Sequence, residues 1–251
     1  MRCVNWLMAA CLGFYGPVAP SLADAGLSAA EKRQVEKLIA DYLMNNPEAL
    51  GDALENMQSH YQQVEEERKK QALRNNAQDL YFADGDFSMG PPDAPITIVE
   101  FFDYNCGYCK RAFDPLMQVM QENDDVRLVF KELPILNEAS RRAAQTALAL
   151  GDQLKFLTFH TKLMTHKGPV NDAFIDRTLK ELKLSAAALD AAAQSDKVQD
   201  TLRRNERLAS LLGIGGTPAF IINDTIYPGA ISKDEMLAAL NGARKALKQT
   251  D

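Results

Sequence analysis

The chain has 251 residues, of which 46% are hydrophobic and 25% are charged. This length fits one large domain, or one ordinary domain with an appendage, and the composition is typical of a soluble globular protein. It excludes a disordered chain, a collagen-like repeat and a polytopic membrane protein. The formal net charge of −6, from 28 basic and 34 acidic residues, gives no electrostatic basis for binding nucleic acid.

The first 23 residues have the features of a secretory signal peptide in the expected order. Arg2 supplies a positive charge, an apolar run follows it, and Ser21 and Ala23 provide a small-residue cleavage site. The run is too short to cross a bilayer. A lipoprotein that begins at Cys11 is the alternative, but few apolar residues precede that cysteine. We therefore expect residues 1–23 to direct export to the periplasm, where disulfides persist.

Residues 24–82 are predicted to form a helical arm. Ser28 and Glu31 have the spacing of a capping box, and Pro47 follows Asn46 as the first residue of a second helix. Two such helices cannot bury a core of their own, so we expect the arm to form a homo-oligomer; folding back on its own domain is the alternative. A narrow coiled-coil seam in the second helix supports association, with apolar residues at Leu50, Leu54, Met57, Tyr61 and Val64.

Residues 83–251 have the pattern of an α/β domain. β-branched and aromatic runs bounded by turn signals predict strands, and a block at about 137–212, rich in Ala, Leu and Lys, predicts several helices. A last helix begins near Ser232. The order of strand, helix, strand, helical block, hairpin and helix fits an α/β sheet with an inserted helical subdomain. The expected strands are residues 96–102, 126–131, 219–222 and 225–227.

Cys106 and Cys109 are the centre of the predicted chemistry. They lie where a buried strand ends and a helix begins, and the free N–H groups of a helix N-terminus stabilise a thiolate. Cys106, expected to be half-exposed, is then the nucleophile that attacks a disulfide, and Cys109 resolves the mixed disulfide. No dissociable cofactor is needed, because the two cysteines carry the redox equivalents. Cys3 and Cys11 leave with the signal peptide.

The cysteine pair has three other interpretations. A structural disulfide would close too short a loop to contribute much chain entropy. Structural zinc would need two further ligands, and His60, His160 and His166 are scattered and expected to be solvated, so no metal site is predicted. Two thiolates suit Cu(I), so a Cu(I) carrier that serves copper tolerance stays open as the alternative function.

Glu100 and Lys131 are charges in otherwise apolar strands. Glu100 precedes Cys106 by six residues, and a charge in such a strand is unfavourable unless it is paired or functional. If the two strands are neighbours, we expect Glu100 and Lys131 to meet beneath the cysteines and pass protons to or from Cys109. An ordinary salt bridge, or a Lys131 that reaches solvent, is the alternative.

The segment 101–109, together with Gly215-Gly216-Thr217-Pro218, resembles the DsbA-type branch of the thioredoxin superfamily. The resemblance covers about residues 85–248 and implies a thioredoxin fold with a helical insert. It also implies that Pro218 is cis and packs against the cysteine pair, and that Thr217 presents its backbone to a substrate peptide. Glu100 and Lys131 resemble the family's buried acid and lysine.

The region before the domain, 41–50, is similar to the arm of ScsC-type proteins, which are exported, oligomeric and linked to copper tolerance. The dipeptide between the cysteines, Gly107-Tyr108, departs from the Pro-His of strongly oxidising DsbA enzymes and resembles that of the isomerase DsbC. It predicts a redox potential nearer about −180 mV than about −120 mV. The resemblance implies a periplasmic oxidoreductase or isomerase of unfolded or misoxidised secreted proteins, recharged by a membrane redox partner.

Overall fold

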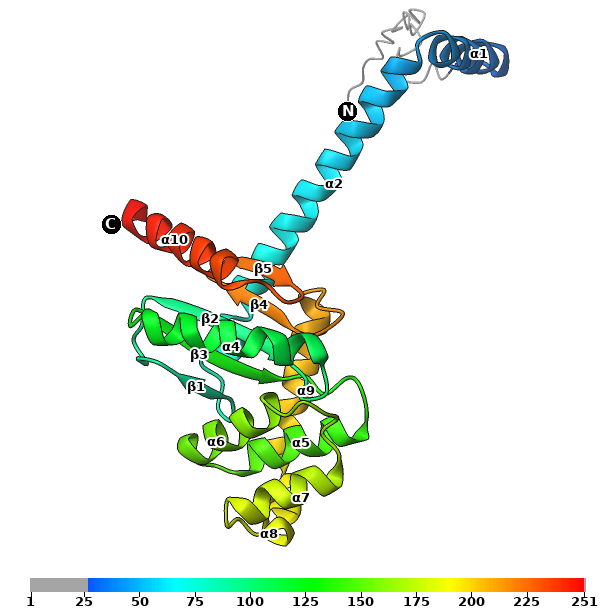
Figure 1. The fold of residues 1–251 in the computed structure, drawn as a ribbon. Coiled ribbons are helices and arrows are strands. Elements are labelled where there is room, and N and C mark those ends of the chain that lie inside the picture. The colour runs from blue at the N-terminus through cyan, green and yellow to red at the C-terminus, as the bar shows by residue number, and fades with distance from the viewer. Residues whose placement is uncertain (1–26, 251) are drawn as a thin grey trace, which may run out of the picture. The chain divides into compact units, whose positions relative to one another are not determined.

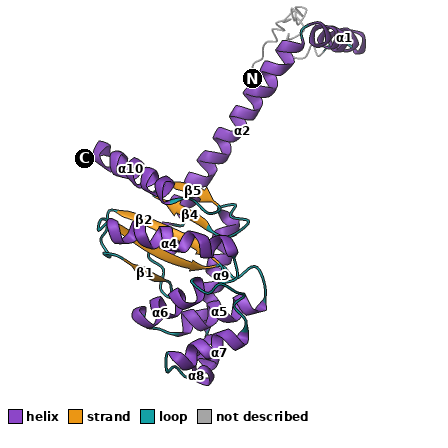
Figure 2. Cartoon of the chain, in the orientation of Figure 1, coloured by secondary structure: helices purple, strands orange, loops and turns teal. Residues whose placement is uncertain are grey.

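The computed structural model describes residues 27–250, and the chain divides into two compact units, residues 1–61 and 62–251. The expected signal peptide lies outside the described residues. Ten helices and five strands are assigned within the described part (Figure 2). Among these helices, none has both the length and the apolar character needed to span a bilayer.

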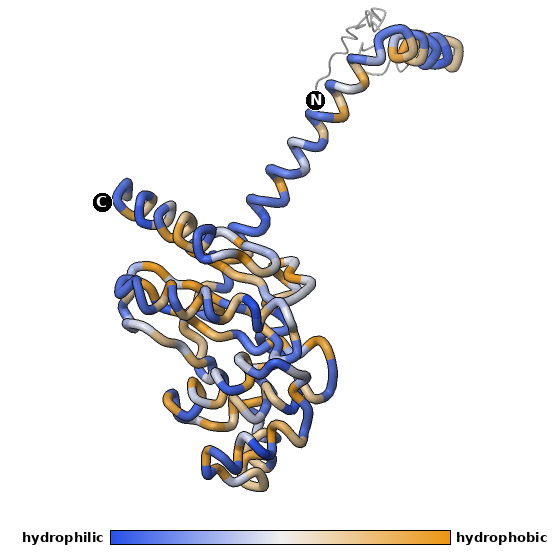
Figure 3. The backbone as a smooth tube through the Cα atoms, in the orientation of Figure 1, coloured by the Kyte–Doolittle hydropathy of each residue, from blue (hydrophilic) through white to orange (hydrophobic). Residues whose placement is uncertain are grey.

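The first unit contains α1 (Ala29–Asn45) and the start of α2 (Pro47–Asn75). The capping box is confirmed: the Ser28 hydroxyl accepts the N–H of Glu31 at 3.3 Å, and the Glu31 carboxylate accepts the N–H of Ser28 at 2.8 Å. No residue of α1 is buried. Along α2, Figure 3 shows hydrophobic positions separated by hydrophilic stretches, and the seam residues among them are exposed.

The second unit, which we call the α/β unit, is built on a five-stranded sheet in the order β1-β3-β2-β4-β5 (Figure 1). β2 and β3 are parallel and joined by α4, whereas the other neighbouring pairs are antiparallel. All seven residues of β2 except Thr97 are buried, because helices cover both faces of the sheet. The strands are β1 (Phe87–Met89), β2 (Ile96–Phe102), β3 (Val126–Glu132), β4 (Ala219–Ile222) and β5 (Thr225–Pro228).

Helices form a layer on each face of this sheet. One core cluster joins Ile98, Phe102 and Phe130 of the sheet to α4, α6 and α10, and a second joins Val99 and Phe101 to α2, α3 and α9. The helical insertion is confirmed, with helices from Glu138 to Leu211. The remaining helices are α3 (Ala77–Tyr81), α4 (Gly107–Glu122), α5 (Glu138–Ala149), α6 (Gln153–Met164), α7 (Asp172–Glu181), α8 (Ala186–Ala193), α9 (Asp196–Leu211) and α10 (Lys233–Thr250).

The division between the units differs from the expected boundary between residues 82 and 83. Leu73 of α2 and Leu80 of α3 are buried in the second core cluster, so the segment after Tyr61 packs as part of the α/β unit. The charged run 65–70 has the composition of a solvated helix, so the sequence contains no sign that the segment after it packs on the sheet. The predicted arm therefore ends later in the chain than the first compact unit does. The apolar positions that follow this run contact the sheet.

Candidate functional site

Cys106 and Cys109 lie at the N-terminus of α4, as expected. Cys106 is the N-cap residue, and its Sγ accepts the backbone N–H of Cys109 at 3.4 Å. Both are free thiols. Cys106 is 7% exposed rather than half-exposed, because the Thr217 segment covers it; its Sγ donates to the carbonyl oxygen of Thr217 at 3.0 Å. Cys109 is fully buried.

The pKa values of the two thiols shift in opposite directions. The hydrogen bond from the Cys109 thiol has the largest effect on the pKa of Cys106. Together with smaller contributions from the Thr217 side chain and from the backbone N–H groups of Cys109 and Tyr108, it outweighs burial and lowers that pKa to about 5. Burial, followed by the hydrogen bond to Cys106 and the charge of Glu100, raises the pKa of Cys109 well above its ordinary value. Cys106 is therefore a thiolate near neutral pH while Cys109 keeps its proton.

Thr217 and Pro218, more than a hundred positions after the cysteine pair in the sequence, lie next to Cys106 in the fold. The Thr217–Pro218 peptide bond is cis, as the resemblance implied, and Pro218 leads directly into β4. The carbonyl oxygen of Pro218 accepts the N–H of Gly229 at 2.9 Å, which ties the cis segment to the end of the β4–β5 hairpin. The hairpin thereby holds Thr217 against Cys106.

Gly107 and Tyr108 are exposed beside the thiolate. Tyr108 is 61% exposed, and the guanidinium carbon of Arg111 lies 4.2 Å from the centre of its ring, a cation–π contact that orients the ring. Gly107 and Arg111 also line a hollow of about 580 Å³ together with Asn105 and Lys110. Both residues of the dipeptide are thus at the surface next to Cys106.

Glu100 is a buried acid close to both cysteines. It is 0% exposed, and neither carboxylate oxygen has a hydrogen-bond partner among the described residues. Burial, and then the charge of Cys106, raises the pKa of Glu100 to about 8. Its charge in turn raises the pKa of Cys109. A carboxyl of this kind can take the proton that Cys109 must lose before it attacks the mixed disulfide.

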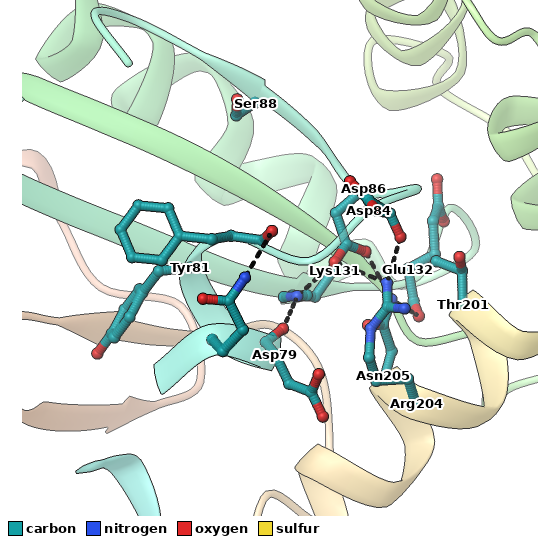
Figure 4. A network of polar contacts seen from close by, with 12 residues as sticks. Asp79, Tyr81, Asp84, Asp86, Ser88, Lys131, Glu132, Thr201, Arg204 and Asn205 are labelled. Carbon is teal, nitrogen blue, oxygen red and sulfur yellow. Dashed lines mark hydrogen bonds and ion pairs between the residues drawn. The ribbon is translucent and has the colours of Figure 1, made fainter. Parts of the chain in front are cut away.

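The expected meeting of Glu100 and Lys131 does not occur. β2 and β3 are neighbours, but Glu100 pairs with Phe130, and Lys131 pairs with Phe101 on the opposite face of the sheet. There the Lys131 Nζ forms an ion pair of 2.5 Å with Asp86 and donates to the carbonyl oxygen of Asp79 at 2.6 Å (Figure 4). Because successive side chains of a strand point to opposite faces, a one-residue difference in register separates the two charges.

The segment before Cys106 is anchored in a way that the sequence analysis missed. The Asp103 carboxylate accepts the N–H groups of Ile135 at 3.0 Å and Leu136 at 3.1 Å, just after β3. Asn105 forms two hydrogen bonds with the backbone of Val170, at 2.8 and 2.9 Å, in the helical insert. Polar residues between a buried strand and a cysteine pair were the available signal, but only the fold shows what they bind.

Glu132, Tyr104 and His160 form a second buried group that the sequence analysis missed. The Tyr104 hydroxyl donates to Glu132 Oε1 at 2.9 Å and lies 3.1 Å from His160 Nδ1. His160, expected on the surface, is 1% exposed; its ring packs between Phe102, Phe130 and Phe156. That expectation was wrong because α6 of the helical insert packs on one face of the sheet, a contact between distant parts of the sequence.

Comparison with known proteins agrees with this geometry. A family model for the DSBA-like thioredoxin domain matches residues 97–241. A thioredoxin-like oxidoreductase from Silicibacter pomeroyi is 35% identical, with a TM-score of 0.65, over 67% of this chain and 97% of that one. The catalytic domain of Proteus mirabilis ScsC is 34% identical, with a TM-score of 0.64, over 69% of this chain and 97% of that one.

Similarity to curated proteins is more limited in extent. The Na⁺/H⁺ antiporter NhaA 1 of Salinispora arenicola is 27% identical over 162 residues, which are 64% of this chain and 25% of the antiporter. The chain thus spans about a quarter of the length of such relatives. The family match covers more than half of the chain and includes the cysteine pair, Glu100 and the cis-proline segment. The chain therefore belongs to the DsbA-like thioredoxin-domain family of thiol–disulfide oxidoreductases.

Proposed function

We propose that this chain is an exported thiol–disulfide oxidoreductase that forms or isomerises disulfides in secreted proteins through Cys106 and Cys109. The observation that carries the proposal is the pair of opposed thiols, a Cys106 thiolate with a pKa of about 5 beside a buried Cys109 that keeps its proton. The Cys106 thiolate attacks one sulfur of a substrate disulfide, and the other substrate sulfur leaves as a thiolate.

Resolution of this mixed disulfide sets the direction of the reaction. In the mixed disulfide Cys106 no longer carries the charge that helps to raise the pKa of Glu100, so Glu100 can ionise and accept the proton of Cys109. Cys109 then attacks Cys106 Sγ, which oxidises the pair and releases a reduced substrate. The reverse sequence oxidises a dithiol substrate. In isomerisation, a second thiolate of the substrate attacks the mixed disulfide instead and restores the Cys106 thiolate.

Thr217, Pro218, Gly107 and Tyr108 form the proposed substrate-binding surface around Cys106. The cis-proline segment lies next to Cys106 Sγ and lines a hollow of about 240 Å³. An extended peptide that pairs with the main chain of Thr217 gains affinity with little dependence on its sequence. Unfolded or misoxidised secreted proteins supply such segments, and a membrane redox partner recharges the pair in the periplasm.

The arm is the proposed oligomerisation element. Its seam residues are exposed, from 45% at Leu50 to 63% at Tyr61, and no residue of α1 is buried. Apolar faces of this kind are stabilised by pairing with copies of themselves. We expect Leu54→Lys combined with Met57→Lys to lower the oligomeric mass in light scattering, and Ser59→Lys, on the opposite face of α2, to leave it unchanged. Equal oligomeric masses for the wild type, the double variant and Ser59→Lys would rule out association through the seam.

Reactivation of scrambled ribonuclease tests the enzyme. The wild-type chain should reactivate it, Cys106→Ser should not, and Glu100→Gln should release substrate from mixed disulfides more slowly than wild type. Tight Cu(I) binding without reactivation would support the copper carrier instead. An equilibrium with glutathione that gives a potential more positive than about −130 mV would exclude the predicted isomerase-like value.

A further inference from the structure

Glu132 is a second buried acid on the same face of the sheet as Glu100. It ends β3, is paired in register with Phe102, and is 1% exposed. Side chains two residues apart on a strand share a face, so Glu132 lies on the face of Phe130, whose partner in β2 is Glu100. The exchange reaction proposed above does not use it.

The contacts of Glu132 connect it to the segment that precedes the nucleophile. Its Oε1 accepts the hydroxyl proton of Tyr104, and that hydroxyl oxygen lies 3.1 Å from His160 Nδ1. Because the Tyr104 proton is already donated, the oxygen is left to accept a proton from Nδ1, which makes His160 the Nδ1–H tautomer. Tyr104 precedes Cys106 by two residues. The chain of hydrogen bonds thus runs from α6 through Tyr104 to the end of β3.

Within the part of the chain that the structure describes, the surroundings of Glu132 contain no cation that balances a negative charge. No ion pair involves Glu132 among residues 27–250, and its Oε2 has no hydrogen-bond partner there. The nearby cations of β3 and α9, Lys131 and Arg204, both pair with Asp86. The groups that act on Glu132 are otherwise acidic or neutral: Glu100 of β2, Asp103 and Tyr104 after β2, Asp86 before β1, and His160 of α6.

Burial raises the pKa of Glu132 well above its ordinary value; the hydrogen bond from Tyr104 opposes this, and the charges of Asp103, Asp86 and Glu100 add to it. Burial also lowers the pKa of His160 to about 3, so the ring is neutral. An ionised Glu132 would have to share one face of the sheet with Glu100 without a counterion, which is unfavourable. The geometry therefore supports an uncharged Glu132.

We propose that Glu132 is a positioning residue of the redox site: an uncharged carboxyl that, through the hydroxyl of Tyr104, holds the segment leading into Cys106, while Glu100 is the acid that titrates with the cysteines. The inference rests on the proposed exchange reaction at Cys106. It assigns separate tasks to the two buried acids, proton transfer to Glu100 and positioning to Glu132.

Infrared spectroscopy of the reduced protein tests the charge of Glu132 without any exchange reaction. We expect a protonated-carboxyl band that persists well above the pKa of Glu100 of about 8 and is lost in Glu132→Gln. A second such band should disappear near that pH and be absent from Glu100→Gln. Absence of the persistent band from wild type, or its survival in Glu132→Gln, would overturn the inference. The same spectra of Cys106→Ser stay informative if the chain exchanges no disulfides.

Exchange kinetics test the positioning role. Glu132→Gln keeps an oxygen that accepts from Tyr104, so its rate should stay within about twofold of wild type, whereas Glu132→Leu and Tyr104→Phe lose the bond and should slow exchange about five- to tenfold. Both should also raise the pKa of Cys106, measured from thiolate absorbance.

The positioning role would be contradicted if Glu132→Leu and Tyr104→Phe exchanged disulfides at the wild-type rate and their Cys106 thiol had the wild-type pKa. A tenfold fall in the proton affinity of Glu100 in Glu132→Gln would show that Glu132 is charged and overturn the proposal. If Glu132→Leu does not fold, Tyr104→Phe tests the same hydrogen bond, because it keeps the ring that packs against Phe102 and Phe159.

Discussion

At the scale of single residues, the proposed nucleophile Cys106 and the proposed resolving thiol Cys109 are coupled by a hydrogen bond. The hydrogen bond from the Cys109 thiol is the main cause of the low pKa of Cys106, which falls from 9.0 to about 5. Alkylation of Cys106 in the reduced protein should therefore accelerate as pH rises through about 5 and then level off. Cys109→Ala removes the donor and should move this rise to higher pH, whereas Cys109→Ser keeps a donor and should move it less. Identical profiles for the two variants would contradict the coupling.

Glu100 should make the folded protein less stable as pH rises. Below pH 4.5 it is protonated in both the folded and the unfolded chain; between 4.5 and about 8 only the folded chain keeps the proton, so stability falls, and above about 8 the loss is complete. Glu100→Gln should therefore gain stability relative to wild type across that window, by about 5 kcal/mol in all. Urea unfolding at several pH values measures this, with the exposed Glu36→Gln as control. A difference that does not change with pH would show that Glu100 titrates normally.

Individual residues also show how far the sequence alone can be interpreted. The positions of Cys106 and Glu100 follow from local patterns, a strand end and a charge within an apolar run. Lys131 has the same local pattern, yet it lies on the other face of the sheet, because register depends on pairing that no single strand encodes. Glu132 and His160 were missed because their partners are distant in sequence.

At the scale of elements, β3 places different charged residues on the two faces of the sheet: Glu132 on one face and Lys131 on the other. Lys131 and Asp86 are 0% and 2% exposed, so Lys131→Met leaves a buried carboxylate whose one remaining ion-pair partner among residues 27–250 is Arg204. We expect a loss of about 3 kcal/mol in the free energy of unfolding. The exchange rate per folded molecule should stay at the wild-type value, because Lys131 does not contact the cysteines.

The double variant Lys131→Met, Asp86→Asn provides the control for this prediction. It removes both charges and should recover part of the lost stability. A Lys131→Met variant that is stable but slow in disulfide exchange would support the catalytic role that the sequence suggested.

Among the elements, the four strands expected from the sequence are present. β1 was not predicted, because it is three residues long and follows a turn-rich stretch.

At the scale of the whole molecule, the boundary between the two units predicts which truncated chains still fold. A chain that begins at Gln62 keeps Leu73 and Leu80 in the core, together with the carbonyl oxygens of Asp79 and Tyr81 that bind Lys131 and Arg127. It should fold and exchange disulfides but lose self-association. A chain that begins at Ala83 loses both leucines, each worth about 2–5 kcal/mol as a leucine-to-alanine change. Thermal unfolding compares the two, and equal melting temperatures would contradict the boundary at residue 61.

The anchoring of residues 103–105 bears on how this kind of active site can be transplanted. Asp103 binds the turn after β3, and Asn105 binds Val170 of the insert, so the backbone entering Cys106 is fixed by groups outside the core sheet. Lys110 adds two more bonds, to the carbonyl oxygens of His166 and Gly168. Grafting the four-residue Cys-Gly-Tyr-Cys motif onto a minimal scaffold would carry the sulfurs without the supports that set their reactivity. The unit that must move intact is the motif together with its helical insert.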